Sequence, residues 1–173
     1  NLERKLNSNN IYGTTDFTTS GSSGADMSGI AFWALGPNGD YFMLDLCLRR
    51  QELEQQYDEL FRMNNYWRRK SRTAPEIGIE IDGQQKAHIS ALESKMILRN
   101  EWFTFGRQRG AKPGSKGILS RLEGGSKHWR FRMMLPLFQN RKIHFPEELR
   151  DTPDMRELME QIKYATYTGF GTK

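Results

Sequence analysis

The strongest constraint on the fold is a change in hydrophobic period near residue 51, which follows three strand-like segments. These apolar segments cover residues 10–16, 27–36 and 41–50, and the last two are joined by the short turn sequence PNGD. Pro and Asn-Gly are typical of turns, and short connections favour antiparallel neighbours. We therefore expect the chain to begin with an antiparallel meander of three strands.

Beyond residue 51, helices and strands alternate. Leu53, Tyr57, Leu60 and Phe61 recur at helical spacing, which predicts a helix over residues 51–70. The pattern then predicts a strand at 76–82, a helix at 85–98, a strand at 101–106, a helix at 129–138, a short strand or extended segment at 141–146 and a helix at 155–167. The order β-β-β-α-β-α-β is typical of an α/β fold in which helices flank a mixed sheet, here of five strands.

A chain of 173 residues fits one domain with a sizeable core. Residues 1–9 are polar and are expected to form a linker or a frayed end, so that the folded domain covers residues 10–173. No apolar run approaches the roughly 18–20 residues of a membrane span, and we expect no membrane partner. Cys47 is the single cysteine and lies in an apolar strand, which favours a buried structural thiol over a nucleophile.

Positive charge is concentrated in the second half of the chain. Residues 1–86 carry 10 Lys and Arg against 12 Asp and Glu, whereas residues 87–173 carry 16 against 9. Within the Gly-rich stretch 106–132 the basic residues are Arg107, Arg109, Lys112, Lys116, Arg121, Lys127, Arg130 and Arg132. Such a segment binds phosphate backbones without reading base sequence. A solvated basic loop without a partner is the alternative interpretation.

Asp16 is an unusual residue for the end of a core strand, because Asp is depleted in strands. It closes the segment IYGTTD, and after Phe17 the chain continues with TTSGSSGAD, a run of small residues. A carboxylate in this position suits Mg²⁺ or Mn²⁺, which prefer oxygen ligands, and small neighbours leave room for a phosphate. A turn-forming or helix-capping Asp is the structural alternative.

Glu80 and Asp82 form a second acidic pair, in the segment GIEIDG. Residues two apart on a strand share a face, so Ile79 and Ile81 are expected to point the opposite way. Two like charges on one face repel each other, and a cation between them relieves that repulsion. A solvent-facing edge strand is the alternative. Asp26 opens the next strand after Asp16 and is a possible auxiliary ligand, although Asp also commonly begins strands.

Other site chemistries find little support in the sequence. The chain has no Gly-x-x-x-x-Gly-Lys-Ser/Thr phosphate loop and no Gly-x-Ser-x-Gly nucleophile motif. His88, His128 and His144 lack the spacing of metal ligands and are interpreted as surface or packing residues.

Taken in order, the acidic strand IYGTTDFT, the second acidic strand IGIEIDG and the basic second half resemble the RNase H-like nuclease superfamily. More narrowly, they are similar to the nuclease domain of the large terminase subunit, the DNA-packaging motor of tailed bacteriophages. The segments KGILSRL, MLPLFQNRKIHFP and ELMEQIKYATY resemble the closing part of that family. The resemblance extends from about residue 10 to residue 173, and the order of the motifs is more specific than any one of them.

The resemblance implies a metal-dependent endonuclease that cuts double-stranded DNA, with little sequence specificity, during viral genome packaging. Asp16 matches the first catalytic acid and Glu80 the second, with Asp82 sharing or replacing the role of Glu80. Together they would hold two divalent cations, Mg²⁺ or Mn²⁺. The implied partners are the terminase ATPase domain, the small terminase subunit and the portal, and the implied location is the host cytoplasm.

One departure from the family pattern concerns the third acid. The family places it in an Asp-rich motif after the last helix, where this sequence ends in GFGTK, so we expect it beyond Lys173 and expect the ATPase domain upstream. Two alternatives remain open. One is another RNase H-like nuclease of resolvase or integrase type, and the other is a non-catalytic DNA-binding or motor-coupling module.

Overall fold

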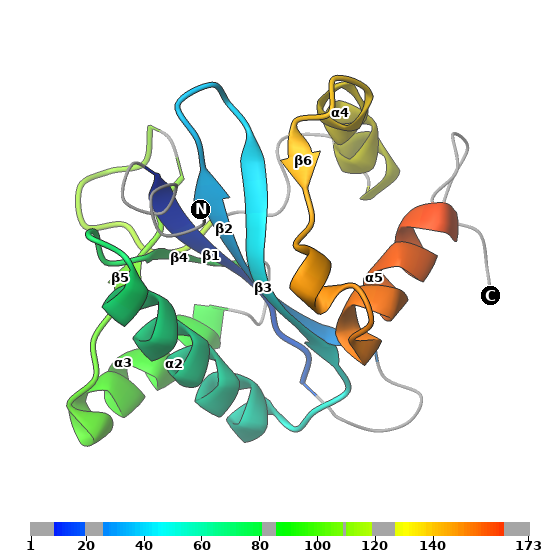
Figure 1. Cartoon of the computed structure of the whole chain (residues 1–173). Helices are drawn as coiled ribbons and strands as arrows, with labels where there is room; N and C mark the ends of the chain where they lie inside the picture. Colours follow the sequence, from blue (N-terminus) through cyan, green and yellow to red (C-terminus); the bar gives the residue numbers. More distant parts are fainter. Residues whose placement is uncertain (1–8, 20–25, 81–85, 109, 119–126, 165–173) are drawn as a thin grey trace.

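The computed structural model describes residues 9–19, 26–80, 86–108, 110–118 and 127–164. Their centre is a six-stranded mixed sheet in the order β5-β4-β1-β2-β3-β6 (Figure 1). The strands are β1 (Asn10–Asp16), β2 (Ser28–Leu35), β3 (Tyr41–Arg49), β4 (Glu76–Ile79), β5 (Thr104–Phe105) and β6 (Ile143–His144). The predicted α/β class with a mixed sheet is confirmed.

The first three strands form the predicted antiparallel meander, and the later strands add to its two sides in parallel. β4 joins β1 and β5 joins β4, whereas β6 joins β3 at the opposite edge. The sheet therefore has one strand more than the five predicted. The extra strand is only two residues long, and its pairing with Tyr41 and Phe42 of β3 carries no signal in the local sequence.

The helices are α2 (Leu53–Lys70), α3 (Lys86–Arg99), α4 (Lys127–Gln139) and α5 (Pro153–Tyr164), with a 3-10 turn, η2 (Glu147–Leu149), before the last. These ranges agree with the predicted helices to within two residues at most of their ends. Helix α5 begins at Pro153, a residue favoured in the first helical position, and the Thr152 hydroxyl accepts a hydrogen bond from Met155 N at 3.3 Å.

Helices α2 and α3 cover one face of the sheet and bury the main core. Tyr57, Leu60 and Phe61 of α2 pack there with Ile77 and Ile79 of β4, all at most 1% exposed. Burying side chains of this size is worth about 1.5–3 kcal/mol each, so this layer supplies most of the stability. A smaller cluster on the opposite face includes Met43 and Leu46 of β3 with Met155 of α5.

Two observations bear on the composition-based expectations. Cys47 is buried, as expected for a structural thiol, and burial raises the pKa of its thiol to about 12. Among the helices in the described part of the chain, none has both the length and the apolar character needed to cross a membrane.

The two strands β4 and β5, on one side of the sheet, are shorter than predicted. β4 ends at Ile79, and Glu80 continues it through an isolated parallel bridge to Ile118, while residues 81 and 82 lie outside the described residues. The predicted strand 101–106 is reduced to Thr104–Phe105. Gly106 N nevertheless donates to Ile77 O at 2.6 Å, which prolongs the contact with β4 beyond β5.

Candidate metal and nucleic-acid site

Asp16 and Glu80 lie at the same end of two neighbouring parallel strands. β1 and β4 pair in parallel with Thr15 opposite Ile79, and Asp16 and Glu80 are the next residue on each strand. Parallel strands place their carboxyl ends at one edge of the sheet. The strand order thus brings together two acids that are 64 positions apart in the sequence.

Both carboxylates belong to the sheet face opposite helices α2 and α3. Ile11 and Thr15 of β1, and Ile77 and Ile79 of β4, are buried, and the alternation of side chains along a strand directs Asp16 and Glu80 the other way. Asp16 is exposed, and the Glu80 side chain is 25% exposed. The predicted orientation of Glu80, opposite Ile79, is what the burial pattern shows.

The two residues after Asp16 are held in place by contacts with α2 and α3. The ring of Phe17 packs against Tyr57 and His88 at centroid distances of 5.2 Å each. Gln56, which is fully buried, accepts a hydrogen bond from Thr18 N at 3.0 Å and donates to Thr18 O at 3.0 Å. The main core therefore fixes the direction in which the chain leaves Asp16.

Tyr57 and His88 form a buried polar pair beneath this segment. A hydrogen bond of 2.6 Å joins the Tyr57 hydroxyl to His88 Nδ1. Burial lowers the pKa of His88, so the imidazole stays neutral at pH 7, and burial raises the pKa of Tyr57 to about 12. His88 is thus a packing histidine, one of the two interpretations the sequence allowed. No prediction was made for Gln56, although its position three residues after Leu53 and four before Leu60 places it on the buried face of α2.

On the β4 side of the site, the backbone of a second segment lies close to the backbone of β4 and of Gly106. Ile118 N donates to Ile79 O at 2.7 Å, and Gly117 N donates to Gly106 O at 2.8 Å. A Cβ atom at Gly106 would lie 3.2 Å from Gly78 Cα, and one at Gly78 would lie 2.8 Å from Ile118 Cδ1. The glycines therefore allow both ends of the loop 107–116 to meet beside Glu80.

The basic residues of the second half are divided between this loop and helix α4. Arg107 and Lys112 are exposed, whereas Lys116 forms an ion pair with Glu93 of α3. Arg130 of α4 approaches Glu80, with 4.0 Å between Nη1 and Oε1. Arg132 is exposed on the same helix. Arg109 and Arg121 lie outside the described residues, as does the side chain of Lys127.

Asp26 and Asp82 complete the predicted set of acids. Asp26 is exposed and lies two residues before β2, whose Gly29 pairs with Asp16, so it belongs to the same end of the sheet. Asp82 lies outside the described residues. Among the residues with described positions, no three Asp, Glu, His or Cys side chains form a metal-ligand cluster.

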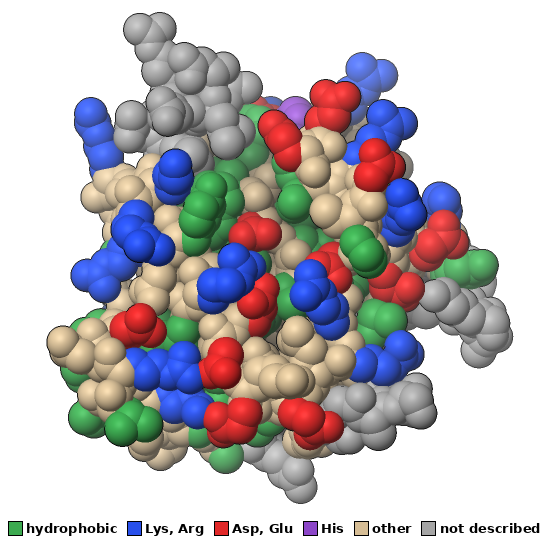
Figure 2. All heavy atoms as spheres, turned by 60° about the horizontal axis from the view of Figure 1, so that its bottom comes forward, with side chains coloured by type: hydrophobic (Ala, Val, Ile, Leu, Met, Phe, Trp, Pro, Cys, Tyr) green, Lys and Arg blue, Asp and Glu red, His purple; other side chains and the backbone are tan. Residues whose placement is uncertain are grey.

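The surface formed by α2 and α3 carries charges of both signs (Figure 2). Figure 2 shows positive and negative side chains interspersed on the face turned toward the viewer. Several of these charges form ion pairs, including Arg62 with Glu59, Lys95 with Glu54 and Arg99 with Asp58. A surface with balanced charge is a poor binding site for a polyanion, which favours the opposite face.

No family model and no curated protein sequence matches the chain. Solved structures do. The manganese-soaked nuclease domain of the human cytomegalovirus terminase is 14% identical, with a TM-score of 0.63 and coverage of 99% of this chain and 81% of that chain. An inhibitor-bound, manganese-soaked form has a TM-score of 0.58 at 13% identity, covering 94% and 77%.

A third structure of the same viral domain has a TM-score of 0.60 at 13% identity, and the alignment covers 89% of this chain and 75% of that chain. The fold is therefore that of the terminase nuclease domains, with RNase H-like architecture. At this level of identity the likeness concerns the course of the backbone. It supports the predicted fold over almost the whole chain.

Proposed function

We propose that this domain is a metal-dependent endonuclease that cleaves double-stranded DNA with little sequence specificity during viral genome packaging. The observation that carries the proposal is the position of Asp16 and Glu80, each directly after the last paired residues, Thr15 and Ile79, of two adjacent parallel strands. It is supported by a fold shared with terminase nuclease domains that were soaked with manganese.

The donor chemistry of the site fits a hard divalent cation. Two carboxylates face the same side of the sheet, Asp16 is exposed, and carboxylate oxygens are ligands that such cations prefer. We propose Asp16 and Glu80 as ligands of two cations, Mg²⁺ or Mn²⁺, with Asp82 as a further ligand and Asp26 as an auxiliary one. Divalent cations held by such carboxylates supply activation of the attacking water and stabilisation of the leaving 3′ oxygen.

The remaining residues bind and position the substrate. Arg107 and Lys112 are exposed on the loop whose ends meet beside Glu80, and they would contact backbone phosphates. Phosphate contacts position a duplex without reading its sequence, which suits an enzyme that cuts with little specificity. The core-facing contacts of Phe17 and Thr18 hold the Asp16 end of the site in place while DNA binds.

The test is a plasmid nicking assay with Mn²⁺ or Mg²⁺ on the wild type, Asp16→Asn and Glu80→Gln. Glu76→Gln is the matched control, because Glu76 begins β4 and lies on the same side of the sheet as Glu80, four residues before it. We expect both site variants to lose at least about 100-fold in rate and the control to keep its rate. Cutting by either site variant at the wild-type rate would disprove the metal-site assignment.

The second candidate is a non-catalytic DNA-binding or motor-coupling module. It is favoured by one observation, the lack of a three-residue acidic cluster among the described residues. It predicts DNA binding without nicking under any metal condition. In either case we propose that the domain works in the host cytoplasm with the terminase ATPase domain, the small terminase subunit and the portal.

A further inference from the structure

Arg130 is a basic residue that the structure places directly beside the proposed metal ligand Glu80. Its Nη1 lies 4.0 Å from Glu80 Oε1, and the two side chains are 36% and 25% exposed. This distance is longer than a direct hydrogen bond, so the pair is held by charge attraction and not by a fixed hydrogen-bonded geometry. Such a contact partly offsets the charge of Glu80 without locking Arg130.

The guanidinium of Arg130 also has spare hydrogen-bonding capacity. Its Nε atom is buried and has no hydrogen-bond partner among the described residues. An arginine has five N–H donors in a planar fork that matches the oxygens of a phosphate. A buried donor without a partner is costly, so the side chain would gain by turning toward an acceptor.

Helix α4, which carries Arg130, packs loosely against the rest of the domain. Trp129 is 44% exposed, Met133 60% and Met134 41%, so large apolar side chains on several sides of the helix remain in contact with solvent. In Figure 1 the helix lies at the β6 side, away from the core formed by α2 and α3. Little packing at these exposed positions opposes a small shift of this helix.

We propose that Arg130 is an internal counter-ion that competes with the metal for Glu80 and moves to a DNA phosphate when the metal binds. The inference rests on the proposed function and adds to it a regulation of the same site. When Glu80 is taken up by a cation, the attraction that holds Arg130 is lost and like charges repel it. The guanidinium, released next to the site, is then placed to donate hydrogen bonds to a phosphate oxygen. Metal and DNA would thereby strengthen each other's binding, as linkage requires.

The first measurement is Mn²⁺ affinity without DNA, from the electron paramagnetic resonance signal of free Mn²⁺. Arg130→Met should tighten Mn²⁺ binding by about three- to fivefold, the size expected for removing one partly exposed charge pair. Arg130→Lys keeps the positive charge and should stay near the wild-type value. Arg132→Met is the matched control, because it removes a positive charge from the same helix at an exposed position.

The second measurement is affinity for a short DNA duplex, with and without Ca²⁺ as a divalent ion that supports little cleavage. Ca²⁺ should strengthen DNA binding by the wild type, and Arg130→Met should lose most of that gain. Arg132→Met should weaken DNA binding equally in both conditions. Thermal unfolding of each variant checks that the domain is folded.

The outcomes separate this inference from the proposed function. If Glu80→Gln weakens Mn²⁺ binding while Arg130→Met and Arg132→Met leave it equally unchanged, the metal site stands and the counter-ion role is wrong. If Glu80→Gln has no effect on Mn²⁺ binding, the proposed metal site itself fails. Tighter Mn²⁺ binding in Arg130→Met alone, together with loss of the Ca²⁺ effect on DNA, supports the inference.

Discussion

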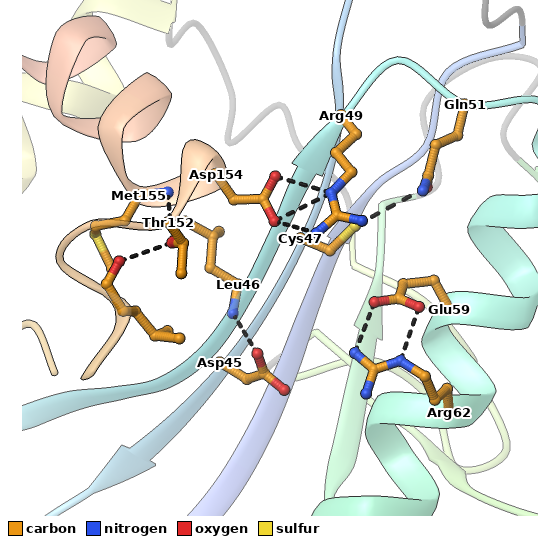
Figure 3. A network of polar contacts seen from close by, with 11 residues as sticks. Asp45, Leu46, Cys47, Arg49, Gln51, Glu59, Arg62, Thr152, Asp154 and Met155 are labelled. Carbon is orange, nitrogen blue, oxygen red and sulfur yellow. Dashed lines mark hydrogen bonds and ion pairs between the residues drawn. The ribbon is translucent and has the colours of Figure 1, made fainter.

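Arg49 at the end of β3 and Asp154 in the first turn of α5 form a bidentate ion pair between positions 105 residues apart in the sequence (Figure 3). Arg49 Nε donates to both carboxylate oxygens at 2.9 and 3.1 Å, and Nη2 donates to Oδ2 at 2.7 Å. Arg49 pairs with Ser28 in the sheet, next to the pair of Leu48 with Gly29. Because Gly29 also pairs with Asp16, this ion pair anchors α5 at the end of the strands where the site lies.

The first prediction concerns the asymmetry of this pair. Asp154 has a side chain only 6% exposed, whereas that of Arg49 is 54% exposed. Arg49→Met leaves a buried carboxylate without its partner and should lower the free energy of unfolding by about 2–3 kcal/mol. Asp154→Asn leaves an arginine that water can solvate, and should cost less. Urea unfolding measures both, with the exposed Arg72→Met as the control.

A reverse order, with Asp154→Asn costing more than Arg49→Met, would show that the carboxylate stabilises α5 chiefly through its position in the first turn. An acidic side chain there interacts favourably with the helix N-terminus. The double variant then apportions the two effects, since the coupling free energy of the pair is the departure from additivity.

The second prediction concerns Gln56, the buried residue that holds the chain after Asp16. Its Oε1 accepts from Thr18 N, and its amide nitrogen donates to Thr18 Oγ1 at 3.1 Å and to Gln51 O at 2.7 Å as well as to Thr18 O. Gln56→Leu should lower the free energy of unfolding by about 2–3 kcal/mol, because it leaves buried backbone groups without partners. It should also speed hydrogen exchange of the Thr18 amide more than that of amides in β2.

The matched control for Gln56 is its exposed neighbour Gln55. The side chain of Gln55 accepts a hydrogen bond from Glu52 N at 3.1 Å in the capping box of α2. Gln55→Leu should cost about 1 kcal/mol and leave exchange at Thr18 unchanged. If both variants behave alike, Gln56 has no special part in positioning the Asp16 segment.

The third prediction is a pH dependence of stability that originates at His88. Burial lowers the pKa of His88 in the folded protein below its ordinary value of 6.5, so the unfolded chain binds a proton that the folded chain does not. The contribution of His88 to the free energy of unfolding should therefore be fully present above about pH 6.5. It should decrease as the pH drops below that value, with a limiting slope of about 1.4 kcal/mol per pH unit for one proton. Denaturation at pH 7.5, 6.5 and 5.5 measures the slope.

His88→Gln should flatten this acid slope, and His144→Gln is its control. His144 is more exposed, lies 3.7 Å from Asp40 and stacks on Phe42 at 4.6 Å, so its loss should leave the contribution of His88 in place.

Tyr57 provides a second check at high pH. Its pKa of about 12 in the folded state exceeds the ordinary value of 10.0, so stability should fall between these values as the unfolded chain releases its proton. Tyr57→Phe should remove that fall.

The sequence predicted the local elements well because their periods are strong. The meander and helix α2 follow from apolar spacing, and the outward direction of Glu80 follows from the buried Ile79 beside it. What local patterns could not predict is the pairing of β4 with β1, which depends on contacts more than 60 positions apart along the chain. The position of Arg130 depends in the same way on how α4 returns to Glu80.

The fourth prediction separates the basic residues of the loop 107–116 by their neighbours. Arg107 and Lys112 are exposed, and each should neutralise one phosphate, so the double variant Arg107→Gln, Lys112→Gln should reduce the slope of log affinity against log salt by about 2. Lys116 is paired with Glu93 of α3, and Lys116→Gln should change that slope by much less. Fluorescence anisotropy of a labelled duplex across a salt series measures the slope for the double variant, for Arg107→Gln alone and for Lys116→Gln. An equal effect of Lys116→Gln and Arg107→Gln would mean that DNA draws Lys116 away from Glu93, and an unchanged slope in the double variant would place the DNA elsewhere on the domain.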